Sequence, residues 1–323
     1  MSARAVWFHR DYRRFTGGHL KHAHYFDHVR RVHGFEPRMT FTGVPATRAL
    51  AAQRMRLWHA EDDHVPDWRP AADDILFVAG TDWRYLNARD LGGLRNPRIN
   101  LVQGVRHAHA ATELYGYLAR RAVRICVSEE VADAIRRTGR VNGPVLTIPN
   151  GIDTPACLRR RGLAKPRTHA VVIIGYKNVA VARALSARLA ARGIGHEAVL
   201  GFMDRDAFLD LLGDTETAVC LPRAEEGFYL PALEAMAAGC MVITMDCVGN
   251  RGFCQHGENC LVGNDAESLT RAVEWARDMP AATRRRMHAS GEETVARHAL
   301  SVERGRFQAV LREIDQLWRM DGA

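Results

Sequence analysis

Short apolar runs alternate along this chain with longer segments in which apolar residues recur at helical spacing. An apolar run of four to eight residues indicates a buried strand, whereas apolar residues recurring every three to four positions indicate a helix. In the first half, a helix-like segment at 20–33 follows the first strand, and Ser128 is placed to cap a helix over 129–138. The predicted strands of this half are 5–8, 75–79, 98–102, 124–127 and 145–148.

The same alternation continues in the second half. The predicted strands are 170–174, 197–200, 218–221 and 240–245, and the predicted helices are 180–192, 205–213 and 232–238. Strands and helices that alternate at these lengths form parallel sheets covered by helices. The pattern therefore predicts an α/β protein with two Rossmann-like domains that face each other across a cleft. In open parallel sheets, ligands bind beyond the carboxyl ends of the strands.

The domain boundaries follow from a change in composition. The segment 157–167 is rich in arginine and flanked by proline, which is typical of a linker between domain 1–156 and domain 168–300. The last segment, 301–323, is expected to be a helix with Ser301 as its cap. One stripe of this helix is apolar: Phe307, Val310, Leu311, Ile314, Leu317 and Trp318.

Composition indicates a globular enzyme-sized protein. The 323 residues are enough for two domains with separate cores. No run of about 18 apolar residues is present, and the N-terminus lacks the apolar run of a signal peptide, so we expect a cytoplasmic protein. The seven cysteines include no C-x-x-C pair, which argues against a disulfide framework or a zinc site.

Positive charge is concentrated in the first half. Residues 1–165 contain 27 lysines and arginines against 16 acidic residues, a net charge of +11, whereas residues 166–323 have 18 against 21, a net charge of −3. A basic face favours an acidic acceptor, an anionic membrane surface or nucleic acid. Nucleic acid is suggested by charge alone, and a simple solvated surface rich in arginine is an equal alternative.

The segment 224–239, A-E-E-G-F-Y-L-P-A-L-E-A-M-A-A-G, is the most informative about chemistry. Gly227 allows a tight backbone approach, Pro231 suits the first turn of a helix, and Gly239 ends that helix. The free amides at the helix start favour a phosphate or a sugar hydroxyl. Glu226 and Glu234 are eight positions apart across this turn, so we expect a two-point clamp on an extended ligand.

This segment resembles the E-x7-E signature of retaining GT-B glycosyltransferases of family 4, with the strand at 240–245 following it. The resemblance implies that Glu226 contacts the donor sugar and that Glu234 holds the ribose hydroxyls. It also implies that the amides between them hold the sugar and its diphosphate, namely those of Gly227, Phe228, Tyr229 and Leu230. Tyr229 replaces the second glycine usual in the family, so we expect its side chain to narrow the sugar pocket or to shift the donor preference.

Further residues are assigned through the same resemblance. Lys177, after the strand at 170–174, lies where the family places a basic residue against the diphosphate, and Arg223 is the candidate for a second positive charge. A solvated loop lysine is the alternative for Lys177. The P-N-G-I-D sequence at 149–153 resembles the element before the interdomain linker. The apolar stripe of 301–323 suits a C-terminal helix that crosses back to the first domain, although plain core packing would explain it equally.

The first half supplies the other candidates. Gly17 and Gly18, followed by His19, open a helix that in the family borders the donor phosphate and the acceptor. Either Gln103 or His107 corresponds to the residue that touches the donor sugar. Three more histidines on the first helix look like metal ligands, but we expect them to be ordinary surface residues. They are His22, His24 and His28.

The sequence thus predicts a metal-independent retaining glycosyltransferase that moves a sugar from a nucleoside-diphosphate sugar to a hydroxyl acceptor. The acceptor would be a glycan, a glycolipid or a small molecule. We expect Glu226, Lys177 and His107 to be the catalytic residues, no cofactor beyond the nucleotide sugar, and peripheral contact with the inner face of the membrane through the basic half. A noncatalytic nucleotide-sugar-binding subunit is the alternative. A nicotinamide-dependent oxidoreductase is disfavoured because no G-x-G-x-x-G follows a strand.

Overall fold

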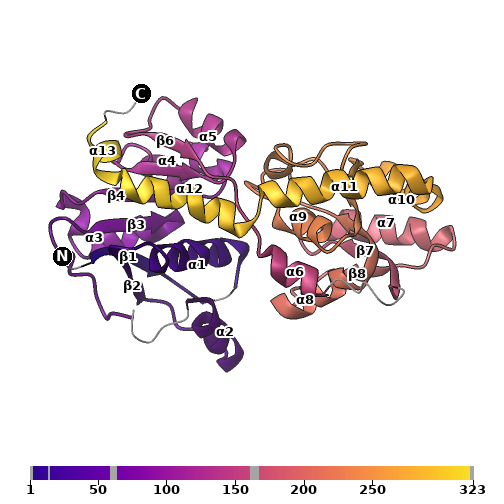
Figure 1. The fold of residues 1–323 in the computed structure, drawn as a ribbon, viewed down its shortest axis with the longest axis horizontal. Coiled ribbons are helices and arrows are strands. Elements are labelled where there is room, and N and C mark those ends of the chain that lie inside the picture. Colours follow the sequence, from indigo (N-terminus) through magenta and orange to yellow (C-terminus); the bar gives the residue numbers. More distant parts are fainter. Residues whose placement is uncertain (1–2, 14, 59–63, 161–166, 321–323) are drawn as a thin grey trace. The chain divides into compact units, whose positions relative to one another are not determined.

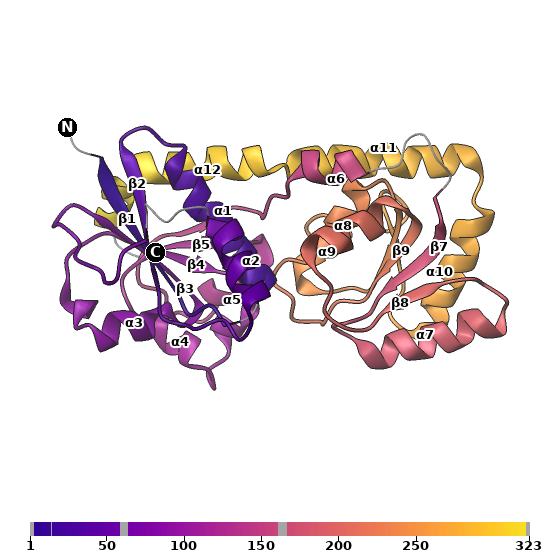
Figure 2. The ribbon, with the colours of Figure 1, turned by 90° about the horizontal axis from the view of Figure 1, so that it is seen from below.

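The computed structural model describes residues 3–13, 15–58, 64–160 and 167–320. The chain divides into two compact units, Met1–Pro149 with Glu303–Ala323, and Asn150–Val302. Figures 1 and 2 show that each unit contains a sheet covered by helices. The predicted fold class, two parallel-sheet α/β units of the Rossmann-like kind, is confirmed. Within the described part of the chain, no helix is long and apolar enough to cross a membrane.

The first unit has a six-stranded, fully parallel sheet with the order β2-β1-β3-β4-β5-β6. Its strands are β1 (Arg4–Arg10), β2 (Phe35–Phe41), β3 (Ile75–Ala79), β4 (Arg98–Val102), β5 (Val123–Cys126) and β6 (Val145–Thr147). Its helices are α1 (Gly17–Arg30), α2 (Arg48–Trp58), α3 (Trp83–Ala88), α4 (Glu113–Tyr117), α5 (Glu129–Arg136) and α13 (Ile314–Arg319), together with most of α12 (Leu300–Arg312).

Alternating side chains of this sheet build a core on each face. Trp7 packs with Trp83 of α3 and Tyr117 of α4 in one core. Its neighbour Phe8 points to the other face, where its ring lies 4.5 Å from that of Phe77 and 5.3 Å from that of Phe26 on α1. Successive residues of a strand point to opposite faces, so the all-apolar strand at 75–79 fits a sheet covered on both sides.

The second unit has a five-stranded parallel sheet with the order β11-β10-β9-β7-β8. Its strands are β7 (His169–Ile174), β8 (Glu197–Val199), β9 (Thr215–Cys220), β10 (Met241–Thr244) and β11 (Leu261–Val262). Its helices are α6 (Thr154–Arg160), α7 (Val179–Ala191), α8 (Arg205–Gly213), α9 (Leu230–Ala237), α10 (Ala266–Asp278) and α11 (Ala281–Arg297). Strand residues such as Val171 and Val219 pack against α7 and α10 in one continuous core.

Each sheet has one point at which the order of strands reverses. In the first sheet this point lies between β1 and β3, and in the second it lies between β7 and β9. The chain leaves neighbouring strands in opposite directions at such a point, which opens a crevice beyond their carboxyl ends. The ends of these four strands are therefore the places to search for a site.

The C-terminal residues belong to the first unit. The ring of Phe307 packs edge-on against Tyr25 at 4.7 Å, and the Arg4 guanidinium binds both carboxylate oxygens of Asp315 at 2.9 Å. Arg121 donates to the carbonyl of Trp318. The boundary between the units lies inside α12, which begins at Leu300, so Ser301 lies within the helix and does not cap it as predicted.

The first residues of the predicted linker, 157–160, are helical in the structure. Residues 157–160 form the end of α6, with Cys157 buried, and α6 packs on α8 and α9. Residues 161–166 lie outside the described residues. Proline and arginine suggested a linker, but Pro155 occupies the first turn of α6, where its missing N–H costs nothing.

The expectation that the α1 histidines lie on the surface is wrong for His22 and His28, which are both fully buried. His28 Nε2 lies 2.9 Å from a Glu303 carboxylate oxygen, and the other oxygen of Glu303 pairs with Lys21. Burial opposes the ionised carboxylate, but Lys21 and the hydrogen bond from His28 outweigh it and lower the Glu303 pKa to about 2. This buried cluster ties α1 to α12.

Candidate functional site

Two predicted site residues meet at the reversal point of the second sheet. Lys177 follows β7 and Glu226 follows β9, and the Lys177 Nζ lies 2.7 Å from Glu226 Oε2. Both side chains are partly exposed, at 30% and 18%. Lys177 therefore has a charged partner within the site and is not the freely solvated lysine of the alternative interpretation. The second oxygen of Glu226, Oε1, has no hydrogen bond to the described residues, so it is available to a ligand.

The loop after Glu226 is held by close backbone packing. A Cβ added to Gly249 would lie 2.4 Å from the Phe228 nitrogen and 2.5 Å from the Glu226 carbonyl oxygen, so only glycine fits there. The Tyr229 amide donates to the Gly249 carbonyl at 3.2 Å. This bond corrects the expectation that the Tyr229 amide is free for a ligand. The Phe228 ring stacks on Phe253 at 5.0 Å, which fixes the outer side of the loop.

Helix α9 starts directly after this loop and holds the second glutamate. It begins at Leu230, has Pro231 in its first turn and ends before Gly239, whose φ is +74°. Glu234 is 1% exposed, and its Oε1 pairs with Nη2 of Arg205 at the start of α8. Its Oε2 has no hydrogen bond to the described residues.

Arg205 is a site residue that the sequence did not suggest. Burial lowers its pKa, but the Glu234 carboxylate outweighs burial and the net shift is upward. The sequence contained only a weak signal for Arg205, because an arginine that follows a capping residue such as Asp204 is also typical of an exposed helix. Only the fold shows that α8 begins beside α9.

Two tyrosines lie close to these ion pairs. Tyr229 is fully buried, and its ring lies beneath the Lys177 ammonium at 5.5 Å. Its hydroxyl is buried without a partner in the described chain, and burial raises its pKa well above the usual value. Tyr229 is therefore packed in the interior beneath Lys177. Burial, followed by the charges of Glu234 and Glu226, also raises the pKa of Tyr176.

Arg223 lies beside Lys177. It is exposed, and its Nε donates to the Lys177 carbonyl at 3.2 Å. The structure thus brings together three cations and two carboxylates at one sheet edge, namely Lys177, Arg205, Arg223, Glu226 and Glu234. The amides of Gly227, Phe228 and Leu230 belong to the same loop and helix start.

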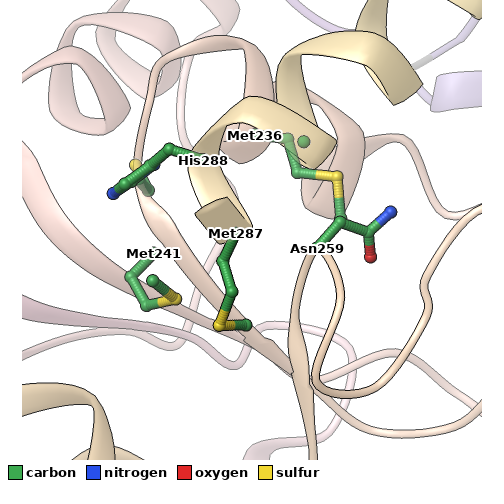
Figure 3. Close-up of a pocket in the computed structure, with 7 residues that line it drawn as sticks. Met236, Met241, Asn259, Met287 and His288 are labelled. Atoms are coloured by element: carbon green, nitrogen blue, oxygen red, sulfur yellow. The ribbon is translucent and has the colours of Figure 1, made fainter. Parts of the chain in front are cut away.

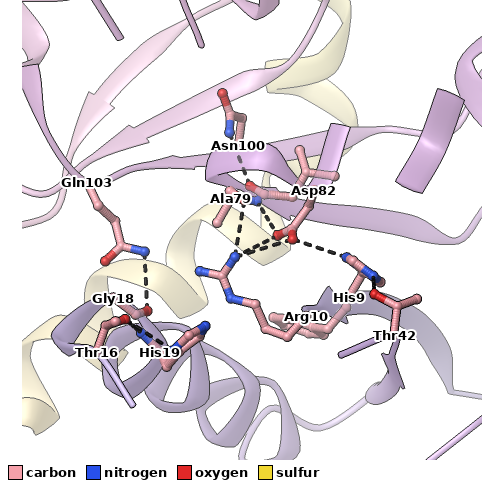
Figure 4. Close-up of polar contacts among 12 residues, drawn as sticks. His9, Arg10, Thr16, Gly18, His19, Thr42, Ala79, Asp82, Asn100 and Gln103 are labelled. Carbon is pink, nitrogen blue, oxygen red and sulfur yellow. Dashed lines mark hydrogen bonds and ion pairs between the residues drawn. The ribbon is translucent and has the colours of Figure 1, made fainter. Parts of the chain in front are cut away.

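The predicted residues of the first unit lie at the carboxyl edge of its sheet (Figure 4). Helix α1 begins at Gly17 and is capped by Thr16, whose hydroxyl accepts from the His19 amide at 3.3 Å. Gln103, after β4, donates to the Gly18 carbonyl at 3.3 Å. Gln103 thus touches the glycine helix directly.

His107 is buried in a short 3-10 helix after β4. Its Nδ1 lies 3.0 Å from the Gly104 carbonyl, and its Nε2 is buried without a partner in the described chain. Burial lowers its pKa to about 4, so the imidazole is neutral at pH 7. Nδ1 therefore holds the hydrogen and donates to Gly104, which leaves Nε2 as an acceptor.

A further polar cluster, missed from the sequence, lies at the reversal point of the first sheet. Arg10, the last residue of β1, donates through Nη1 to Asp82 at 3.1 Å and to the Ala79 carbonyl at 3.2 Å. Asp82 also accepts from the Ala79 amide at 2.8 Å and lies 3.1 Å from His9. Figure 4 shows the three polar side chains converging beyond the ends of β1 and β3.

A small hollow elsewhere in the second unit is lined mainly by sulfur-containing side chains (Figure 3). It lies between α9 and α11, with Met236, Met241 and Met287 around it. None of the predicted site residues lines it. Methionine fills irregular gaps in cores, so we interpret this hollow as packing between helices.

Part of the chain matches a known protein family, and its fold is shared by solved structures. Residues 163–294 match the family model of glycosyl transferases group 1. A search of curated protein sequences found no match. These 132 residues contain both glutamates of the E-x7-E segment, Lys177 and Arg205.

Solved structures resemble nearly the whole chain. A glycosyltransferase from Rickettsia africae matches 98% of this chain and 100% of its own, with a TM-score of 0.70 and 11% identity. Sucrose-phosphate synthase from Thermosynechococcus elongatus matches 98% of this chain and 100% of its own, with a TM-score of 0.66 and 14% identity. HepE from Anabaena, solved with UDP-glucose, matches 96% of this chain and 99% of its own, with a TM-score of 0.69 and 13% identity. At these identities the similarity shows a shared fold.

Proposed function

We propose that this protein is a retaining glycosyltransferase that moves a sugar from a nucleoside-diphosphate sugar to a hydroxyl acceptor without a metal ion. The main support is the E-x7-E segment at the reversal point of the second sheet, where Glu226 and Glu234 each lie beside a cation. The match of this half to glycosyl transferases group 1 supports the same activity. Since similar structures contain UDP or UDP-glucose, we propose a UDP-sugar as the donor substrate.

In this proposal the glutamates position the donor substrate and the cations neutralise it. The free Oε2 of Glu234 accepts from a ribose hydroxyl, and the free Oε1 of Glu226 accepts from a hydroxyl of the sugar. Lys177 keeps two further N–H groups beyond its bond to Glu226, which can donate to the diphosphate. Arg205, Arg223 and the loop amides add positive potential on the same edge.

The bond from the anomeric carbon to the diphosphate oxygen then breaks with negative charge developing on that oxygen. Because Lys177 is held by Glu226, it stabilises this charge without first reorganising. The acceptor hydroxyl attacks from the face that the diphosphate leaves, and the departing phosphate oxygen takes its proton. The configuration at the anomeric carbon is thus retained. Gln103 and His107 are the two candidates in the first unit for a contact to the sugar.

A pair of adjacent glutamates gives a matched test. Glu226→Gln should lower kcat with a UDP-sugar by about 100-fold or more, because the sugar and Lys177 lose their common partner. The neighbouring exposed Glu225→Gln should leave kcat unchanged. Turnover is measured with UDP-sugars and a panel of hydroxyl acceptors. Equal turnover in the two variants would refute the assignment.

Binding is tested separately from turnover. A UDP-sugar at 100 times its dissociation constant should stabilise the protein by about 2.7 kcal/mol, visible as a rise in Tm. Glu234→Ala should abolish this rise. A rise in Tm without turnover on any acceptor would identify a noncatalytic nucleotide-sugar-binding subunit. No rise with UDP-, GDP-, dTDP- or ADP-sugars would contradict the proposal.

A further inference from the structure

Arg10 in the first unit has two edges in different environments. The side chain is 9% exposed at the carboxyl end of β1. Its Nη1 is fully engaged, by the Asp82 carboxylate at 3.1 Å and by the Ala79 carbonyl at 3.2 Å. Asp82 is itself held by the Ala79 amide and by His9, whose other ring nitrogen lies 2.9 Å from the Thr42 hydroxyl. The guanidinium is therefore held in one orientation.

The opposite edge of this guanidinium has no partner among the described residues. Nε is buried and makes no hydrogen bond in the described chain, and no described residue accepts from Nη2. In Figure 4 all dashed lines from Arg10 start at Nη1, and the edge formed by Nε and Nη2 has none. A buried N–H without an acceptor is unfavourable, because it loses its hydrogen bond to water and gains none in return.

A structural role explains only the Nη1 edge. Asp82 needs a counter-charge because it is buried, and Nη1 provides it. The Nε and Nη2 donors are parallel and about 2.3 Å apart, which is the geometry that binds two oxygens of a carboxylate or phosphate. A guanidinium fixed on one edge and unpaired on the other is suited to bind an oxyanion.

We propose that the Nε and Nη2 edge of Arg10 binds the carboxylate or phosphate monoester of an anionic acceptor. The assignment of this oxyanion to the acceptor rests on the proposed transferase activity, whereas oxyanion binding itself does not. Arg10 ends at the reversal point between β1 and β3, where a parallel sheet binds ligands. The same β1–α1 connection ends in Gly17 and Gly18, whose amides lie in the first turn of the 14-residue helix α1 and have no intrahelical acceptor.

Charge in the surroundings supports an anion. His9, His19 and Arg10 all act electrostatically on the buried His22 and, after burial itself, lower its pKa well below the usual value. These groups therefore lie around one small region of the first unit. Asp82 is the carboxylate nearest to Arg10, and its charge is already paired with Nη1. The half of the chain that contains this region has a net charge of +11.

The test measures oxyanion binding without any nucleotide sugar. Isothermal titration with inorganic phosphate, glucose 6-phosphate and glucuronate should detect binding that neutral glucose lacks. Arg10→Lys keeps the charge beside Asp82 but removes the parallel donors, so it should weaken binding of at least one of the anions about tenfold or more. Arg13→Gln, which changes an exposed arginine three positions away, should leave that affinity unchanged.

Lys177→Ala separates this site from the diphosphate site of the second unit. Phosphate binding that persists in Lys177→Ala and is lost in Arg10→Lys supports the proposal. Binding that survives in a folded Arg10→Lys variant, or is lost equally in Arg13→Gln, overturns it. If Arg10→Lys does not fold, the test uses the wild-type protein alone. Equal affinity of the wild-type protein for glucose, glucose 6-phosphate and glucuronate would also overturn the proposal.

The two proposals fail in different ways. If phosphate or glucuronate depends on Arg10 but no UDP-sugar raises the Tm, the oxyanion site is real and the transferase assignment is wrong. If a UDP-sugar binds and is turned over but no oxyanion depends on Arg10, the transferase is right and its acceptor is not recognised here. The ratio of the affinities for glucose 6-phosphate and glucuronate shows whether the site prefers a phosphate or a carboxylate.

Discussion

Each glutamate of the E-x7-E segment lies beside a cation from another part of the chain. Glu226 meets Lys177 from the end of β7, and Glu234 meets Arg205 from the start of α8. In each pair, one carboxylate oxygen has no hydrogen bond to the residues that the structure describes. At the scale of single residues the site is thus close to electrically balanced before a ligand enters, and the diphosphate would add the excess negative charge.

Arg205 should matter for both stability and binding. Arg205→Met leaves the buried Glu234 without its cation, so we expect the free energy of unfolding to fall by about 2–3 kcal/mol. UDP-sugar affinity should fall in the same variant. Chemical denaturation and titration calorimetry measure the two effects. Arg223→Met, at an exposed arginine of the same edge, should have no effect on stability, and a similar loss in both variants would contradict the specific role of Arg205.

His107 should make stability depend on pH. Burial lowers its folded pKa to about 4, whereas an unfolded histidine titrates near 6.5. Between these values the unfolded chain binds the proton and the folded chain does not, so stability falls as pH decreases from about 6.5 to 4. His107→Gln should reduce this decrease, by up to about 3 kcal/mol at pH 4. Denaturation at several pH values measures it, and an unchanged pH dependence would show that the ring is not buried neutral.

At the scale of helices and strands, periodicity predicted the central elements well. Strands 75–79 and 98–102 agree with β3 and β4 residue for residue, and Ser128 caps α5 by accepting from Val131 at 3.3 Å. Both strands are buried along their whole length; the sequence of β3 is continuously apolar, whereas β4 also contains the buried polar residues Arg98 and Asn100. Strand β2 was missed because it lies at a sheet edge, where Glu36 and Arg38 remain partly exposed and Pro37 is unusual for a strand.

The part of the candidate site that could be predicted is the part whose residues lie in one short segment of the sequence. Glu226 and Glu234 were identified from one segment, whereas Lys177 was assigned through the resemblance to the family; the structure places Lys177 against Glu226. Arg205 and the Arg10–Asp82 pair were missed because their partners are 29 and 72 positions away. No local pattern marks such a pair, since only the strand order brings the two ends together.

The loop between the glutamates should be sensitive to Gly249. A methyl group there would meet the Phe228 nitrogen at 2.4 Å and the Glu226 carbonyl oxygen at 2.5 Å, so the loop must move. Gly249→Ala should therefore lower the free energy of unfolding by about 1–3 kcal/mol and lower kcat/KM. Gly201→Ala is the control because nothing lies within 4 Å of its added Cβ and its φ is not positive. Thermal melts and initial rates compare them, and similar behaviour of both variants would refute tight packing of the loop.

At the scale of the whole molecule, charge separates the two halves. The first half has a net charge of +11 and the second of −3. We propose that the basic half contacts anionic lipid headgroups. The intact protein should co-sediment with vesicles containing phosphatidylserine at low salt, and this binding should disappear near 1 M salt, where the Debye length is about 3 Å. Vesicles of phosphatidylcholine alone are the control. No binding to either at low salt would identify the basic surface as merely solvated.

The first unit is discontinuous in sequence, since Glu303–Ala323 complete what Met1–Pro149 begin and the second unit is inserted between them. Glu303 provides the counter-charge for the buried Lys21, and Phe307 fills a place beside Tyr25. A ribosome synthesises Met1–Pro149 before the second unit and Glu303–Ala323 after it. The first unit is therefore completed only after the inserted unit has been synthesised, and until then Lys21 lacks its ion pair with Glu303 and Tyr25 lacks its contact with Phe307.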